Sequence, residues 1–149
     1  MGKWAKDLFG KEEFDDIGIV LAGTNKLEYE KKVLNMFDEV ISSKDSVYHA
    51  HLVRKEKRLI PLVTNVYGAP AMLDVLTQMH DGGCKTIIFI GYAYGGFKNL
   101  EVGDIAIPNK VYHFDGIYHA LKIDKEATYP NKELKDKLQL VLKSNKIEF

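Results

Sequence analysis

Cysteine is nearly absent from this sequence, since its 149 residues include a single one, Cys84. One cysteine cannot form a disulfide within the chain, and such scarcity is typical of a reducing compartment. No apolar run reaches the roughly 20 residues that a membrane-spanning helix needs. The first residues, MGKWAKDLFGKEEF, also lack the apolar core of a signal peptide. These absences predict a cytoplasmic protein.

Net charge is absent as well, because 21 lysine and arginine residues balance 21 aspartate and glutamate residues. A neutral chain gives no reason to expect binding to nucleic acid or to an anionic membrane. Internal repeats and low-complexity tracts are missing too. With 46% apolar and 28% charged residues, the composition predicts one globular domain over residues 1–149.

What the sequence does contain is an alternation of short apolar runs and amphipathic stretches. The apolar and alternating runs predict strands at 16–23, 46–55, 58–68, 84–91, 103–108 and 146–149. Apolar residues spaced by three and four positions predict helices at 25–41, 69–83 and 131–145. This order predicts an α/β fold with a mixed, mostly parallel central sheet flanked by helices.

Two of the predicted strands carry a more specific expectation. Residues 84–91 form the most apolar strand, which predicts burial on both faces within a parallel sheet. Pro61 lies inside the strand at 58–68 and predicts an edge position or a bulge there, because proline cannot donate a ladder hydrogen bond.

Three turns that contain glycine follow predicted strands: AGTN at 22–25, NVYGAP at 65–70 and GYAYGG at 91–96. Ligands of open α/β sheets bind over the turns at the carboxyl ends of the strands. Glycine lets backbone N–H groups approach an anion or another polar ligand closely. The three turns together are therefore the candidate site, although each glycine taken singly could serve only to shape its turn.

The order and spacing of these segments resemble the nucleoside phosphorylases and nucleosidases of the uridine phosphorylase and hexameric purine nucleoside phosphorylase type. The likeness lies in IVLAG at 19–23, in the strand, turn, helix and strand of 63–91, and in GYAYGGFKNLEVGDIAIP at 91–108. The distance from Gly91 to Gly103 and Asp104 matches the nucleosidase branch. The resemblance covers roughly residues 16 to 108, and the remainder to 149 is compatible with it.

The resemblance implies cleavage of the N-glycosidic bond of a purine or pyrimidine nucleoside, with phosphate as the acceptor. It implies no other cofactor, no metal, and a homo-oligomer that is a dimer or a trimer of dimers. It identifies no catalytic residue. The residues that it assigns to nucleoside binding are Gly23, Asn65, Tyr67, Gly68, Gly91, Tyr92, Ala93 and Gly95. Those that it assigns to phosphate are Gly23, Lys26 and Tyr92.

The sequence also departs from the family's patterns. Phe89 stands where a pattern like IRxGT has arginine, and Leu27 stands where GDPxR has arginine. An arginine holds phosphate through paired charge-assisted hydrogen bonds, which neither replacement can make. A hydrolytic nucleosidase and a non-catalytic member that binds nucleoside or a partner chain therefore stay open. Tyr92 and Tyr94, which replace smaller residues, either stack on a base or fill the emptied phosphate pocket.

Length is a further departure, because family members are typically far longer and carry ribose and base contacts in their second half. This chain ends at KIEF, where the family would begin another core strand. The expected fold is therefore nucleoside-phosphorylase-like, corresponds to the N-terminal portion only, and is apparently truncated at its C-terminus. Such a sheet would expose an edge strand.

A few polar residues have alternative interpretations. His49 and His51 alternate on a predicted strand and so project to one face, but no cysteine or carboxylate cluster completes a metal site, and we interpret them as surface histidines. Asp104 is either a site residue or a turn aspartate. His113 and Asp115 form either an acid–base pair at a pocket mouth or ordinary loop polarity.

Overall fold

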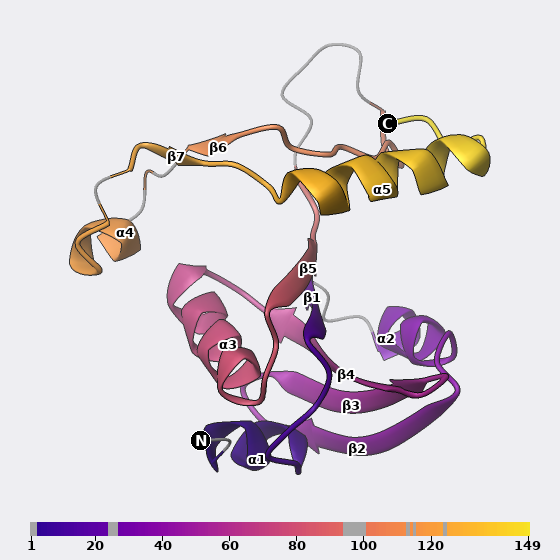
Figure 1. Ribbon diagram of the computed structural model, residues 1–149, viewed down its shortest axis with the longest axis vertical. Helices are drawn as coiled ribbons and strands as arrows, with labels where there is room; N and C mark the ends of the chain where they lie inside the picture. The colour runs from indigo at the N-terminus through magenta and orange to yellow at the C-terminus, as the bar shows by residue number, and fades with distance from the viewer. Residues whose placement is uncertain (1–2, 24–26, 94–100, 113, 115, 124) are drawn as a thin grey trace. The chain divides into compact units, whose positions relative to one another are not determined.

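The computed structural model describes residues 3–23, 27–93, 101–112, 114, 116–123 and 125–149. The chain divides into two compact units, Met1–Ala93 and Tyr94–Phe149, which are considered separately below (Figure 1). The expectation that residues 1–149 form one domain stays a prediction.

The first unit is built on a five-stranded sheet with the order β2-β3-β4-β1-β5 (Figure 1). The strands are β1 Ile17–Ala22, β2 Glu39–Asp45, β3 His49–Lys55, β4 Arg58–Val66 and β5 Thr86–Ile90. Strand β1 is parallel to both of its neighbours, β4 and β5, whereas β2 and β4 each run antiparallel to β3. The predicted mixed sheet is therefore confirmed.

Helices cover both faces of this sheet, as predicted. They are α1 Lys3–Phe9, α2 Leu27–Leu34 and α3 Ala69–Asp81. Because successive strand side chains point to opposite faces, Val20 packs in a cluster with residues of α1 and α3, while Leu21 packs in a second cluster with residues of α2. Helix α1 was not predicted, and it buries Leu8 and Phe9 in the first cluster.

Helix α3 confirms the prediction made for residues 69–83. Pro70 lies in its first turn, where the missing N–H leaves no intrahelical hydrogen bond unmade. The helix ends at Asp81, and Gly82 follows as its C-cap, with its N–H donating to the carbonyl of Gln78 at 3.2 Å. Met79 and Val75 are its fully buried residues and attach it to the sheet.

The helix predicted for residues 25–41 is too long. Helix α2 ends at Leu34, and residues 39–45 form strand β2 instead. Strand β2 pairs with β3, so its backbone groups are satisfied by a distant segment that local periodicity cannot reveal. Ile41, which fitted the helical spacing, packs from this strand against the cluster that contains α1 and α3.

Of the two specific strand expectations, the edge position and the burial on both faces are wrong, whereas the bulge is present in β4 but lies at Asn65, between the pairs Leu21↔Thr64 and Ala22↔Val66. Strand β4 is not an edge strand, since it lies between β3 and β1. Pro61 lies opposite Leu52 of β3, and the pairing with β1 begins one residue later, at Leu62. The chain that leads into β1 also borders this part of β4, because the Asp15 N–H donates to the carbonyl of Leu59 at 2.9 Å, so the proline is tolerated in an interior strand. Strand β5 pairs only with β1 among the described residues, and its Phe89 is 60% exposed rather than buried.

The second unit contains the antiparallel pair β6 Val111–Tyr112 and β7 Ala127–Thr128, and the helices α4 Gly116–Ala120 and α5 Lys132–Ser144. Helix α5 confirms the prediction for 131–145, and the Asn131 side chain caps it by accepting the N–H of Leu134 at 3.0 Å. The strands predicted at 103–108 and 146–149 are wrong, because no described segment pairs with either of them.

Gly82 offers a test of how closely the first unit is packed. A Cβ built on Gly82 would lie 2.1 Å from the ring of Phe14, which itself packs edge-on against Phe9 at 5.2 Å. We expect Gly82→Ala to lower the free energy of unfolding by roughly 1–3 kcal/mol, the usual effect of overpacking. Urea denaturation followed by the fluorescence of Trp4, the single tryptophan, measures this change.

The matched control is Gly116→Ala, because a Cβ there meets no atom within 4 Å. It should leave the urea midpoint of the first unit unchanged. Equal midpoints for Gly82→Ala and the unsubstituted chain would contradict the packing of Phe14 against Gly82.

Candidate functional site

The carboxyl ends of β4, β1 and β5 lie next to one another, because these strands are neighbours and run in the same direction. The three glycine turns predicted as the candidate site follow these ends. The Gly23 N–H donates to the carbonyl of Val66 at 3.3 Å, which joins two of the turns. A Cβ built on Gly23 would lie 3.7 Å from Tyr92 and 4.0 Å from Tyr67, so the third turn is joined as well.

Local backbone geometry explains why several of these residues are present. Gly23 and Gly68 have φ of 76° and 79°, in the region that L side chains rarely adopt. Asn65 has φ of 61°, and asparagine tolerates that region better than most residues. A Cβ on Gly91 would come within 3.1 Å of the Phe89 ring. Each residue therefore has a structural reason, and its predicted binding role stays a prediction.

A cavity of about 240 Å³ lies beside these turns. Its lining residues share a lack of charge and are Ala22, Val66, Gly68, Ala69, Met72 and Phe89. Phe89 stands where the resemblance places an arginine, so this wall presents carbon atoms where a guanidinium would bind an anion. The phosphate site expected by resemblance therefore has no cation among the residues that line this cavity.

Three tyrosine rings gather around the Gly23 turn. Tyr92 and Tyr67 are 73% and 55% exposed. The third ring, Tyr29 of α2, lies 6.4 Å from Tyr92 between centroids, tilted by 55°. Exposed aromatic faces suit stacking on a nucleobase. The sequence prediction missed Tyr29, and its position in the first turn of the helix that follows AGTN was the signal that could have identified it.

Not every predicted site residue can be placed. Lys26 and Gly95 lie outside the described residues, as do the paired residues His113 and Asp115 and the replacement residue Tyr94. Ala93 ends the first unit, directly after Tyr92.

Asp104 has a local partner. Its carboxylate accepts the N–H of Glu101 at 2.8 Å, which is the contact expected of a turn aspartate. The turn interpretation therefore has an observed hydrogen bond, and the role of Asp104 as a site residue stays a prediction.

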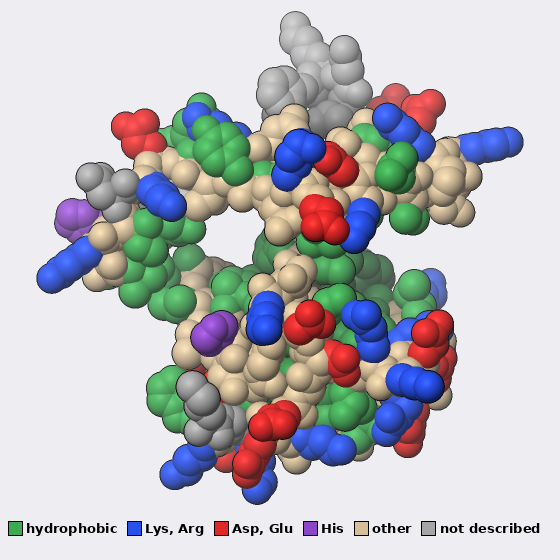
Figure 2. Space-filling view, in the orientation of Figure 1, with side chains coloured by type: hydrophobic (Ala, Val, Ile, Leu, Met, Phe, Trp, Pro, Cys, Tyr) green, Lys and Arg blue, Asp and Glu red, His purple; other side chains and the backbone are tan. Residues whose placement is uncertain are grey.

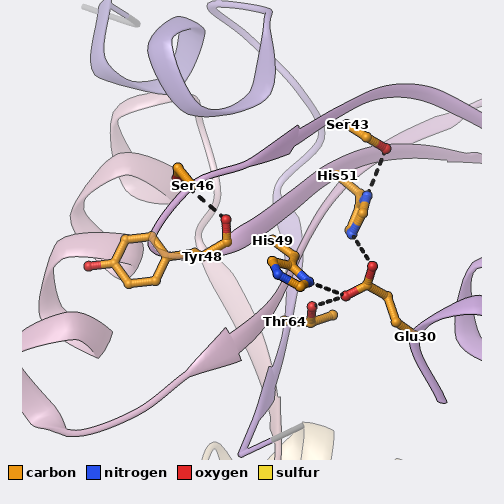
Figure 3. A network of polar contacts seen from close by, with 7 residues as sticks. All are labelled: Glu30, Ser43, Ser46, Tyr48, His49, His51 and Thr64. Atoms are coloured by element: carbon orange, nitrogen blue, oxygen red, sulfur yellow. Dashed lines mark hydrogen bonds and ion pairs between the residues drawn. The ribbon is translucent and has the colours of Figure 1, made fainter. Parts of the chain in front are cut away.

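A polar network that the sequence did not suggest lies under α2 (Figure 3). Glu30 of α2 reaches between β3 and β4. Its Oε2 accepts a hydrogen bond from Thr64 Oγ1 at 2.5 Å and lies 2.8 Å from His49 Nδ1. Its Oε1 lies 3.5 Å from His51 Nε2, and His51 Nδ1 is 2.8 Å from Ser43 Oγ. One carboxylate thus gathers polar groups from two strands.

The interpretation of both histidines as surface residues is wrong for His51, which is only 3% exposed. Both rings do project to one face, as the strand period requires, but that face is covered by α2. His51 Nε2 lies outside hydrogen-bond geometry with Glu30, and it is the one buried side-chain polar atom without a hydrogen-bond partner in the described part of the chain. No three histidine, cysteine or acidic side chains of the described residues are arranged to hold a metal ion.

The charges of this network follow from burial and hydrogen bonding. Burial lowers the pKa of His51, more strongly than the nearby Glu30 and Asp45 raise it. Burial also acts to raise the pKa of Glu30, but hydrogen bonds from Thr64 and His49 outweigh burial and leave that pKa below its usual range. At neutral pH the network therefore holds an ionised carboxylate beside a neutral His51.

A comparison with known proteins identifies the family. Residues 18–149 match the family model of the phosphorylase superfamily. The chain belongs to the phosphorylase superfamily. No curated protein matched it. The resemblance read from the glycine turns is therefore confirmed at the level of the family.

Solved structures share the fold of this phosphorylase-superfamily chain. One is purine nucleoside phosphorylase from Toxoplasma gondii in complex with immucillin-H, with a TM-score of 0.78 and 17% identity, covering 92% of this chain and 55% of that one. Another is uridine phosphorylase from Vibrio fischeri ES114, with a TM-score of 0.78 and 14% identity, covering 91% of this chain and 56% of that one. The chain thus spans a little over half the length of these structures.

Four further expectations concern membrane crossing, cellular location, assembly and cofactors. No described helix is both long enough and apolar enough to cross a bilayer. The cytoplasmic location, the homo-oligomer and the absence of a cofactor other than phosphate stay predictions.

The burial of His51 predicts a pH dependence of stability. Its pKa is lower in the folded chain than the ordinary 6.5, so the unfolded chain binds the proton first as the pH falls. We expect the free energy of unfolding to decrease from pH 7 towards pH 5, and to decrease further below pH 4.5 as Glu30, with its lowered pKa, is protonated. Urea denaturation at a series of pH values measures both decreases.

The substitution His51→Gln removes the imidazole that takes up a proton in this range. It should therefore reduce the loss of unfolding free energy between pH 7 and pH 5. His80→Gln is the matched control, because it removes an exposed histidine of α3 that stands outside the Glu30 network, and its decrease between pH 7 and pH 5 is compared with that of His51→Gln. A decrease of the same size in His51→Gln and in the unsubstituted chain would count against a buried, neutral His51.

Proposed function

We propose that this chain supplies the nucleoside-binding portion of a site that cleaves the N-glycosidic bond of a purine or pyrimidine nucleoside, with phosphate as the acceptor. The observation that carries the proposal is the gathering of Tyr29, Tyr67 and Tyr92 on the Gly23 turn, at the carboxyl ends of three adjacent parallel strands. Family membership supports it. The two solved structures that share the fold, a purine nucleoside phosphorylase and a uridine phosphorylase, support the choice of nucleosides as the proposed substrate class.

The arrangement suits particular parts of this chemistry. Tyrosine faces hold a base by stacking, and turn N–H groups offer donors to ribose or to an acceptor molecule. Cleavage also needs an aligned nucleophile and stabilisation of the leaving base. The cavity lining carries no charge for that purpose. We therefore propose that a neighbouring subunit contributes the charged groups, in agreement with the expected homo-oligomer.

A hydrolytic nucleosidase is the second candidate, and one observation favours it. Phe89 and the other uncharged residues of the cavity lining provide no cation to hold phosphate, whereas water needs none. In this alternative the same tyrosines bind the nucleoside and water replaces phosphate as the acceptor. A non-catalytic nucleoside-binding protein is the third possibility, and the same experiment separates the three.

The test is release of free base from uridine, inosine and methylthioadenosine by the 149-residue chain, each with and without phosphate. We expect release that requires phosphate. Release that is equal without phosphate would replace the first proposal by the nucleosidase. Absence of release by folded protein that binds nucleoside would contradict both enzymatic proposals and leave the binding protein.

The aromatic contacts give a separate prediction about nucleoside affinity. We expect Tyr92→Ala to raise the dissociation constant of a bound nucleoside about tenfold, because base stacking is worth roughly 1–3 kcal/mol per base. Tyr92→Phe should preserve affinity, since it keeps the ring. Isothermal titration calorimetry provides the measurement.

Trp4→Ala is the control for this prediction, because Trp4 is an aromatic residue of the same unit, is 59% exposed on α1 and stands outside the glycine turns. It should leave the dissociation constant unchanged. Unaltered affinity in Tyr92→Ala would show that the base does not stack on this ring.

A further inference from the structure

We propose that Glu30 is a positioning residue, which ties α2 to strands β3 and β4 and thereby holds Tyr29 against Tyr92 beside the Gly23 turn. The expected effect of Glu30 on nucleoside affinity rests on the proposed function, whereas its expected effect on the contact between Tyr29 and Tyr92 does not. The network around Glu30 is otherwise unused by the proposed chemistry, since none of its members lines the cavity beside the turns.

The first step of the argument is the burial of a charge. The Glu30 side chain is only 12% exposed, and an ionised carboxylate in such a place is costly unless it is paired and hydrogen-bonded. Its hydrogen-bond partners come from two different strands, Thr64 from β4 and His49 from β3, and His51 of β3 lies 3.5 Å from its other oxygen. A shift or rotation of α2 would remove the carboxylate from these groups, so the network allows one placement of the helix.

The second step concerns how little else determines that placement. Helix α2 has eight residues, too few to be stable in isolation. Its Tyr29, Val33 and Leu34 pack on the sheet as partly buried residues. Such apolar contacts set which face of the helix meets the sheet, but because they are largely non-directional they oppose small shifts and rotations only weakly. Hydrogen bonds with fixed donors supply the specificity that apolar contacts lack.

The third step connects the anchor to the site. Tyr29 immediately precedes Glu30, and consecutive helical residues point about 100° apart. Glu30 therefore reaches β3 and β4 while Tyr29 reaches Tyr92, which follows β5 on the other side of β1. Tyr92 in turn lies against Gly23. Fixing Glu30 fixes the third ring of the tyrosine group.

Several titratable groups surround this anchor and must be held in one state during a test. They are Glu30 itself on α2, His49 and His51 on β3, and Asp45 on β2. Measurements at pH 7.5, roughly one unit above the ordinary histidine pKa of about 6.5, keep His51 neutral and Glu30 ionised.

The experiment compares Glu30→Gln with Glu28→Gln, a matched control because Glu28 is exposed on the same helix. The first readout is the nuclear Overhauser effect between ring-edge protons of Tyr29 and Tyr92 in the whole chain. We expect it to be lost in Glu30→Gln and kept in Glu28→Gln. Retention in Glu30→Gln would overturn the proposal, whether or not any nucleoside binds.

A second pair keeps the test decisive if Glu30→Gln does not fold. Thr64 is fully buried, so Thr64→Val removes only the donor to Glu30 at nearly constant volume, whereas Thr64→Ser keeps the hydroxyl. We expect the ring contact to weaken in Thr64→Val and to be restored in Thr64→Ser. Equal contacts in the two variants would overturn the proposal.

The final readout is a double-mutant cycle on uridine binding. If Glu30 acts through Tyr29, Glu30→Gln should weaken binding about fivefold or more in the unsubstituted chain, and less than about twofold in a Tyr29→Ala background. Equal weakening in both backgrounds would overturn the action through Tyr29. If the unsubstituted chain binds no uridine, inosine or methylthioadenosine, the proposed function fails, and the ring contact still decides the role of Glu30.

Discussion

The parallel pairing of β1 with β4 and β5 is the constraint on which the candidate site depends. Parallel strands bring their carboxyl ends to one edge of the sheet, and the turns that follow must meet there. Gly23, Tyr67 and Tyr92 are far apart along the chain, yet they contact or approach one another for this reason alone. The candidate site therefore depends first on the register of three central strands.

A buried charge provides the second constraint. The apolar clusters on the two faces of the sheet attach the helices by burying apolar surface. The Glu30 carboxylate favours one orientation of α2, because only there do its oxygens meet hydrogen-bond donors. Removing Thr64 or His49 would take a hydrogen bond from a carboxylate that is only 12% exposed, which is costly in free energy. The network also couples the antiparallel half of the sheet, through His49 and His51, to a helix that carries one of the site's aromatic rings.

The sequence predictions succeeded where the signal is local. Helices α3 and α5 begin and end near the predicted residues because proline, glycine and asparagine act within one turn of the backbone. They failed where a distant partner decides. Residues 39–45 became a strand because β3 pairs with them, and the strand that contains Pro61 became an interior strand because β3 and β1 lie on either side of it. The three turns of the candidate site were found, but neither Tyr29 nor Glu30 was, since their roles arise from contacts across the sheet.

The sequence by itself determined the family, the order of the central elements and the glycine turns, because spacing and backbone preference are properties of neighbouring residues. Only the tertiary structure decided which side chains those turns face. A histidine on an alternating strand can be exposed or buried, and the sequence shows the alternation without showing what covers it. Helix α2 covers His51 and brings Glu30 to it, because burying an apolar sheet face and pairing a carboxylate are achieved together by one placement of that helix.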